Sequence, residues 1–64
     1  MTEFEPIEPR RVRMTQESQW AGEGGHLVAV HRRLQIYRIQ LDRQPVNCTT
    51  REFLVDKQQF EAMK

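Results

Sequence analysis

The chain has 64 residues, a formal net charge of +1 and 30% charged residues. A chain of this length forms one domain at most and hides only roughly 60% of its unfolded surface, which excludes a multidomain architecture. Its longest apolar run, residues 27–30, is far short of the roughly 20 residues that a membrane span requires, so we expect membrane contact only through a partner. The single cysteine, Cys48, cannot form an internal disulfide, and no signal-peptide pattern opens the chain, which predicts a reducing compartment.

Charge is distributed unevenly along the chain. Residues 1–9 carry three glutamates and no base, whereas residues 10–43 carry seven arginines against three acids, a net charge of +4. The planar guanidinium of arginine binds carboxylates and phosphates bidentately, so this bias favours an acidic partner. The alternative is a solvated surface that keeps a small domain soluble. The candidate partner-contact residues are Arg10, Arg11, Arg13, Arg32, Arg33 and Arg43.

The N-terminal third predicts an arm, a strand and a loop. Residues 1–9 contain two prolines and three glutamates, which is typical of a flexible, extended arm. Residues 10–15 alternate between apolar and polar side chains, as in a half-buried strand. Residues 16–25 form a loop, because Gly22, Gly24 and Gly25 permit the positive φ angles of tight turns.

The middle of the chain predicts two strands joined by a turn. Strands are expected at residues 26–31 and 34–41, with a turn at 32–33. Apolar residues from 27 to 41 also recur in steps of three and four, so an amphipathic helix is the alternative. We favour strands because a helix would leave several β-branched residues on its polar side. Ile36 and Tyr37 cannot both face inward on a regular strand, which calls for a bulge or a strong bend.

The C-terminal third completes an all-β pattern. Residues 42–47 read as a turn around Pro45, and a further strand lies within residues 46–55. Asp56 is a suitable N-cap for a single helical turn within residues 57–64, and a last short strand there is equally compatible. Several short strands with regular turn signals favour one small barrel over residues 10–64.

The aromatic residues are the expected anchors of such a core. A domain this small has few large side chains, so the burial of each aromatic ring contributes strongly to its stability. The rings expected in the core are Trp20, Tyr37, Phe53 and Phe60. We assign Trp20, Tyr37 and Phe53 as structural core residues. Nucleic-acid binding is weakly indicated, because Tyr37 and Trp20 are the side chains that could stack on bases and the net charge is small.

No constellation of residues predicts catalysis, a metal or a cofactor. His26 and His31 are five residues apart on one predicted strand and should point to opposite faces, as surface histidines. Cys48 has no partner at ligand spacing and reads as a core thiol. Ser18 has no base near it in the sequence. We therefore expect neither enzymatic activity nor a bound cofactor or metal.

Several short segments, in order, resemble the PsaE family, subunit IV of the photosystem I reaction centre. The segments are "VRM", "ESQW", "EGG", "LVAV", "IYRIQL", "VN" and the closing "FLVD" followed by "FE". The blocks at residues 20–30 and 37–47 align without a gap. The matching positions are Val12, Arg13, Glu17, Ser18, Trp20, Glu23, Gly25, Val30, Tyr37, Val46, Asn47 and Phe53. The variable chain of ferredoxin–thioredoxin reductase is a related SH3-like chain that also fits this pattern.

The resemblance implies a fold and a function. It implies a five-stranded SH3-like barrel that is a non-catalytic, cofactor-free peripheral subunit on the cytoplasmic or stromal face of the photosynthetic membrane. Its partners would be the photosystem I core and iron–sulfur subunits, with ferredoxin or flavodoxin docking transiently and no nucleic acid. The chain departs from the family pattern at Arg38 and Arg43, and at Asp42, where the family has an arginine thought to act toward ferredoxin.

Overall fold

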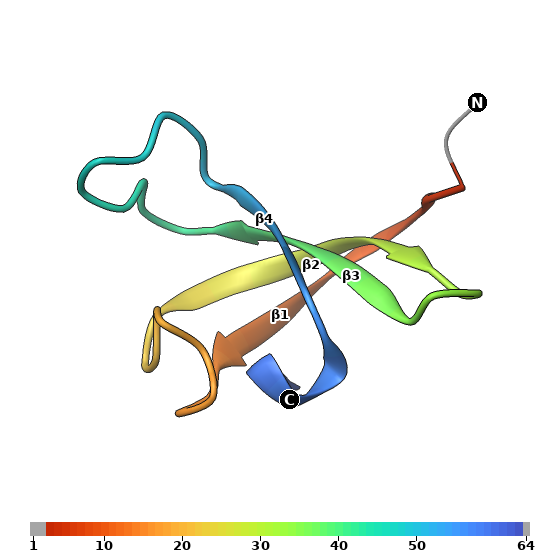
Figure 1. The fold of residues 1–64 in the computed structure, drawn as a ribbon, viewed down its shortest axis with the longest axis horizontal. Helices are drawn as coiled ribbons and strands as arrows, with labels where there is room; N and C mark the ends of the chain where they lie inside the picture. The colour runs from red at the N-terminus through yellow and green to blue at the C-terminus, as the bar shows by residue number, and fades with distance from the viewer. Residues whose placement is uncertain (1–2, 64) are drawn as a thin grey trace.

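In the computed structural model, which describes residues 3–63, the chain folds into five antiparallel strands and one short 3-10 turn (Figure 1). The elements are β1 (Glu5–Met14), β2 (Gly24–His31), β3 (Ile36–Leu41), β4 (Glu52–Val55), η1 (Lys57–Gln59) and β5 (Phe60–Ala62). The strands form one curled sheet in the order β4-β3-β2-β1-β5. This arrangement is the small SH3-like barrel that was expected, and the helical alternative for residues 27–41 is wrong because they lie in β2 and β3.

Strand β1 begins earlier than the sequence predicts. It starts at Glu5, inside the segment assigned to an N-terminal arm, and there Glu5 pairs with Val30 and Pro6 with Ala29. Strand β5 covers only residues 12–14 of β1, so the first half of β1 has a free edge within residues 3–63. Pro6 and Pro9 lie on this half and lack an N–H, which protects the edge against pairing with another strand.

The sheet contains one bulge between β2 and β3, and it lies in β2. Leu27 pairs with Ile39 and Ala29 pairs with Arg38, so one extra residue, Val28, is accommodated between them. Tyr37 and Ile39 therefore share the inner face of the sheet, while Ile36 lies on the outer one. The expectation of a bulge or bend at Ile36 and Tyr37 is therefore wrong, because β3 alternates regularly there and the extra residue belongs to β2.

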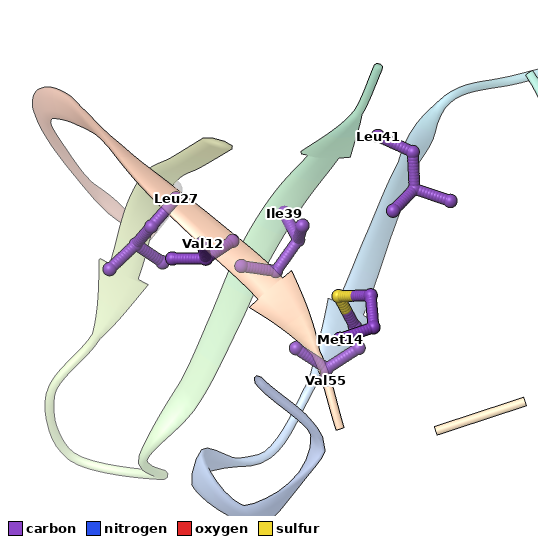
Figure 2. Packing of buried hydrophobic residues seen from close by; sticks show 6 residues of the cluster. All are labelled: Val12, Met14, Leu27, Ile39, Leu41 and Val55. Carbon is purple, nitrogen blue, oxygen red and sulfur yellow. The ribbon is translucent and has the colours of Figure 1, made fainter. Parts of the chain in front are cut away.

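The buried core is aliphatic, and the aromatic residues lie at its margin. Its members are Val12, Met14, Leu27, Ile39, Leu41 and Val55, which converge from β1, β2, β3 and β4 (Figure 2). Trp20, Tyr37 and Phe53, predicted as core, are only partly buried and pack against this cluster. Trp20 lies against Phe53 with ring centroids 4.1 Å apart, and Tyr37 meets Phe60 edge to face at 5.2 Å. The aromatic pairs thus cover the aliphatic core rather than forming its centre.

The glycines have two different roles. Only Gly22 has a positive φ, +86°, in the loop between β1 and β2, as the turn prediction requires. Gly24 and Gly25 belong to β2, so their assignment to the loop is wrong. A Cβ on Gly25 would lie 2.6 Å from the carbonyl oxygen of Gln40, so this glycine allows β2 and β3 to approach closely.

The C-terminal segment contains both of the alternatives that the sequence allowed. Asp56 caps η1, because its side chain accepts a hydrogen bond from the Gln58 backbone N–H at 3.0 Å. The Thr15 hydroxyl donates to the Gln58 carbonyl at 2.6 Å, which ties η1 to the end of β1. β5 then pairs with β1, and Lys64 lies outside the described residues.

Candidate partner-binding surface

The six arginines predicted to contact a partner do not form one patch. Two lie on the outer face of β1, two in the turn after β2, and the remaining two in separate places. Four of them are in ion pairs: Arg11 with Asp42 (3.4 Å), Arg13 with Glu61 (3.5 Å), Arg32 with Glu5 (2.8 Å) and Arg33 with Glu3 (2.7 Å). Exposed pairs of this kind contribute about 0–1 kcal/mol each, yet they neutralise much of the positive surface.

Arg32 forms a close ion pair with Glu5, the first residue of β1. A side-chain hydrogen bond with Glu5, and next the negative charge of Glu5, raise the pKa of Arg32 above its ordinary value. Arg32 and Arg33 bind glutamates that precede or begin β1, so the turn after β2 holds the N-terminal segment through charge. These two arginines have a structural use besides any partner contact.

Asp42 lies between two basic groups. Its carboxylate is 3.4 Å from the Arg11 guanidinium and 3.6 Å from Nδ1 of His26. Its backbone N–H also donates to the Gly24 carbonyl at 3.0 Å. Asp42 therefore joins the end of β3 to β1 and β2 and removes positive potential from this part of the surface.

Arg10 and Arg43 make no ion pair with any residue between positions 3 and 63. Arg43 is the second residue of the long segment between β3 and β4, and this segment projects from the sheet (Figure 1). It lines a hollow of about 200 Å³ together with Trp20 and Val46, and Val46 is 88% exposed. Arg10 lines two different hollows, which share no lining residue with the hollow at Arg43. The available cations are thus at two distinct sites.

The site around Arg10 is a groove beside the aromatic pair of Tyr37 and Phe60. Two adjoining hollows of about 260 and 380 Å³ share the side chains of Arg10, Leu27 and Tyr37. We call these the Tyr37 groove, whose main lining residues are Ile7, Arg10, Leu27, Tyr37, Lys57 and Phe60. The sequence singled out Tyr37 and Arg10 separately but gave no signal that Lys57 and Phe60 would join them.

Arg10 holds an unusual position for a charged residue. It pairs directly with Leu27, so its side chain leaves the sheet on the same face as Leu27 and Val12. That face is the inner face of the barrel, yet Arg10 is exposed at the mouth of the groove. Its aliphatic stem can cover apolar surface while the guanidinium stays in water. The groove thus combines an apolar floor with a cation that no described acid neutralises.

The outer face carries a second small cluster around His31, which the sequence placed on the surface. His31 is only 6% exposed. Its Nδ1 accepts a hydrogen bond from the Leu34 backbone N–H at 3.1 Å, so the ring proton lies on Nε2, 3.3 Å from the Glu3 carboxylate. Phe4 packs its ring against His31, and the Arg38 guanidinium lies 4.8 Å from the Phe4 ring centre.

The bulge also corrects the expected orientation of the histidines. His26 pairs with Gln40 and His31 with Ile36, so both lie on the outer face rather than on opposite faces. They still interact with different acids, Asp42 and Glu3 respectively. Among residues 3–63 there is no group of three metal-ligating side chains close enough to hold a metal ion.

Cys48 and Ser18 have structural contacts. Cys48 is half-buried in the segment between β3 and β4, so its interpretation as a core thiol is wrong. Its backbone N–H donates to the Pro45 carbonyl at 3.2 Å. Ser18 is buried, and its hydroxyl accepts the Trp20 backbone N–H at 3.0 Å. This bond fixes the loop in which Trp20 approaches Phe53.

Comparison of the chain with family models, curated proteins and solved structures gives no match. The resemblance to the PsaE family therefore rests on the sequence segments quoted above. Within the described part of the chain, no helix has the length and apolar character needed to cross a membrane.

Proposed function

We propose that this chain is a non-catalytic adaptor that binds protein partners through the surface of its SH3-like barrel. The observation that carries the proposal is the Tyr37 groove. Protein interfaces place apolar and aromatic side chains at their centre and polar groups at their rim, with aromatic residues and arginine enriched. The groove has Tyr37 and Phe60 beside an apolar floor, with Arg10 and Lys57 at its edge.

Ser18 and His31 have structural roles in the fold, which favours a binding function over serine-based catalysis. The hydroxyl of Ser18 is buried and already bonded to the backbone of the Trp20 loop. A catalytic serine requires a base within hydrogen-bond reach and access to substrate. His31 is enclosed on the outer face with its ring nitrogens facing Leu34 and Glu3.

Photosystem I is the first complex in which to look for the partners, because of the sequence resemblance. In that setting the chain is a peripheral subunit on the cytoplasmic or stromal side that packs on the core and iron–sulfur subunits. It stabilises the acceptor side and assists transient docking of ferredoxin or flavodoxin. Acidic carriers are attracted by surface cations over a distance that shortens as salt rises, and Arg10 and Arg43 are the predicted arginines left for that purpose. Support for this setting is the sequence resemblance together with the barrel fold.

Co-purification tests the proposal. Photosystem I isolated from the source organism after gentle solubilisation should contain the chain in a fixed ratio to the core subunits. Absence of the chain from photosystem I removes that complex as its setting. The adaptor function then depends on whether the chain is found in any other assembly larger than its own 7.7 kDa.

Nucleic-acid binding, the alternative from the arginine content, has less support. Four of the six candidate arginines bind acids of the same chain. Tyr37 and Trp20, the aromatics that could stack on bases, pack against Phe60 and Phe53. A single-stranded oligonucleotide that binds tightly at low salt, with a steep salt dependence, would reverse this ranking.

A further inference from the structure

The two cations of the Tyr37 groove differ from most other basic groups of the barrel. Arg10 and Lys57 are exposed and have no ion pair with any described acid. The other ionisable side chains that line the groove are Arg32, Glu61 and His31, which lie within ion-pair distance of Glu5, Arg13 and Glu3 respectively. The groove therefore presents two unneutralised positive charges.

The cations lie on elements that are far apart in sequence. Arg10 belongs to β1 and Lys57 to η1, and both line the hollow of about 380 Å³ that Leu27 and Phe60 also line. Val12 and Leu27 also line this hollow, and both belong to the buried core. Figure 2 shows them within that core. A side chain that enters the groove thus meets apolar groups below and positive charge at the rim.

We propose that the Tyr37 groove binds an extended acidic segment of a partner protein, which inserts one apolar side chain between carboxylate-bearing residues. This inference rests on the proposed adaptor function and specifies its partner. The apolar side chain occupies the hollow beside Tyr37 and Phe60, and the flanking carboxylates bind Arg10 and Lys57. Charge-assisted hydrogen bonds to carboxylates are stronger than neutral ones, and arginine can bind them bidentately.

The polar groups of the groove favour a peptide segment over a small-molecule ligand. Ligand pockets usually contain several converging polar groups that orient the ligand. Here two hollows share Arg10, Leu27 and Tyr37, and the cations without an ion pair among residues 3–63 that line them are Arg10 and Lys57. Two adjoining hollows accommodate successive side chains of an extended chain.

The aromatic geometry favours a peptide over a nucleic acid. Base binding requires free aromatic faces on which bases can stack. Tyr37 and Phe60 instead meet edge to face, with an interplanar angle of 67°, and pack against the core. They form a wall for an aliphatic side chain rather than a stacking platform.

The test is an NMR titration of the full chain, labelled with ¹⁵N, with a synthetic peptide probe. The probe carries one leucine flanked on both sides by glutamates in a glycine and serine background. Two further peptides replace the glutamates by glutamine or the leucine by serine. We expect the first probe to shift the amide signals of Arg10, Leu27, Tyr37 and Phe60, and both altered peptides to bind more weakly.

Charge variants locate the binding site. Arg10→Gln and Lys57→Gln should each raise the Kd of the acidic probe by about threefold to tenfold, since each removes one charge-assisted contact. Arg43→Gln is the matched control, because Arg43 is also exposed and without an ion pair among residues 3–63. Arg43 lines the separate hollow beside Trp20 and Val46. It should leave the Kd unchanged. All three positions are exposed, so the dispersed spectrum of the folded barrel should persist.

Four results would overturn the inference: no binding of the acidic probe, equal binding of the glutamine peptide, equal weakening by Arg43→Gln, or displacement of the probe by a single-stranded oligonucleotide. The experiments distinguish an error in the peptide-binding assignment of the groove from an error in the proposed adaptor function. If the chain is found in a larger complex but ignores the probe, the groove assignment alone is wrong. If the probe binds but the native chain is monomeric in every fraction, the adaptor function is wrong.

Discussion

Gly25→Ala should destabilise the barrel, although alanine is intrinsically the better strand residue. Glycine in a strand costs about 0.5–1 kcal/mol relative to alanine, so propensity alone predicts stabilisation. The added Cβ would lie 2.6 Å from the Gln40 carbonyl oxygen and 3.2 Å from Leu41 Cα. Overpacking costs about 1–3 kcal/mol, and the upper part of that range applies because the obstacle is backbone. After the gain in strand propensity is subtracted, the free energy of unfolding should fall by about 1–2 kcal/mol.

Urea unfolding followed by fluorescence of Trp20, the single tryptophan, measures this loss. Stability of the whole barrel should be about 3–10 kcal/mol by the usual per-residue range, so the shift in midpoint is readily detected. Gly24→Ala is the control, since its Cβ would meet a movable carboxylate oxygen of Asp42 at 2.9 Å. It should cost less than Gly25→Ala. A Gly25→Ala protein as stable as the parent chain would refute the close approach of β2 and β3.

Three further substitutions test individual contacts. Ser18→Ala removes the acceptor for the Trp20 N–H and should cost about 1–2 kcal/mol in urea unfolding, with a change in tryptophan emission as the loop loosens. Asp56→Ala removes the cap of η1 and should cost about 0.5–2 kcal/mol, with faster amide exchange in β5; unchanged exchange would contradict the cap. Asp42→Asn breaks an exposed pair with Arg11 and should change stability by less than about 1 kcal/mol, an effect that should shrink further in high salt.

The strand pattern was predictable because it follows from local alternation of side chains. The predicted strand at residues 26–31 lies within β2, and the Asp56 cap and the two C-terminal elements occur where the sequence allowed them. The exception was β1, whose first residues contain prolines and glutamates and looked disordered. Pairing of Glu5 with Val30 and the ion pair with Arg32 hold that segment, and both depend on tertiary structure.

The candidate site was far less predictable than the fold. Arg10 was one of six candidate arginines in the sequence. Alternation puts it on the same face of β1 as Val12, but only the strand register places it beside Leu27. Because of the bulge at Val28, each later side chain of β2 lies on the opposite face from the one that regular alternation predicts. His31 was therefore assigned to the wrong face. Ion pairing could not be predicted either, because the pairs of Arg13 and Arg33 join residues far apart in the chain.

The size of the native assembly tests the adaptor function most directly. Extracts and gently solubilised membranes of the source organism can be separated by size, with the chain followed by a specific antibody. We expect the chain to migrate with a complex much larger than its 7.7 kDa, and photosystem I fractions are the first to examine. Migration as a free monomer in every fraction would contradict the adaptor function.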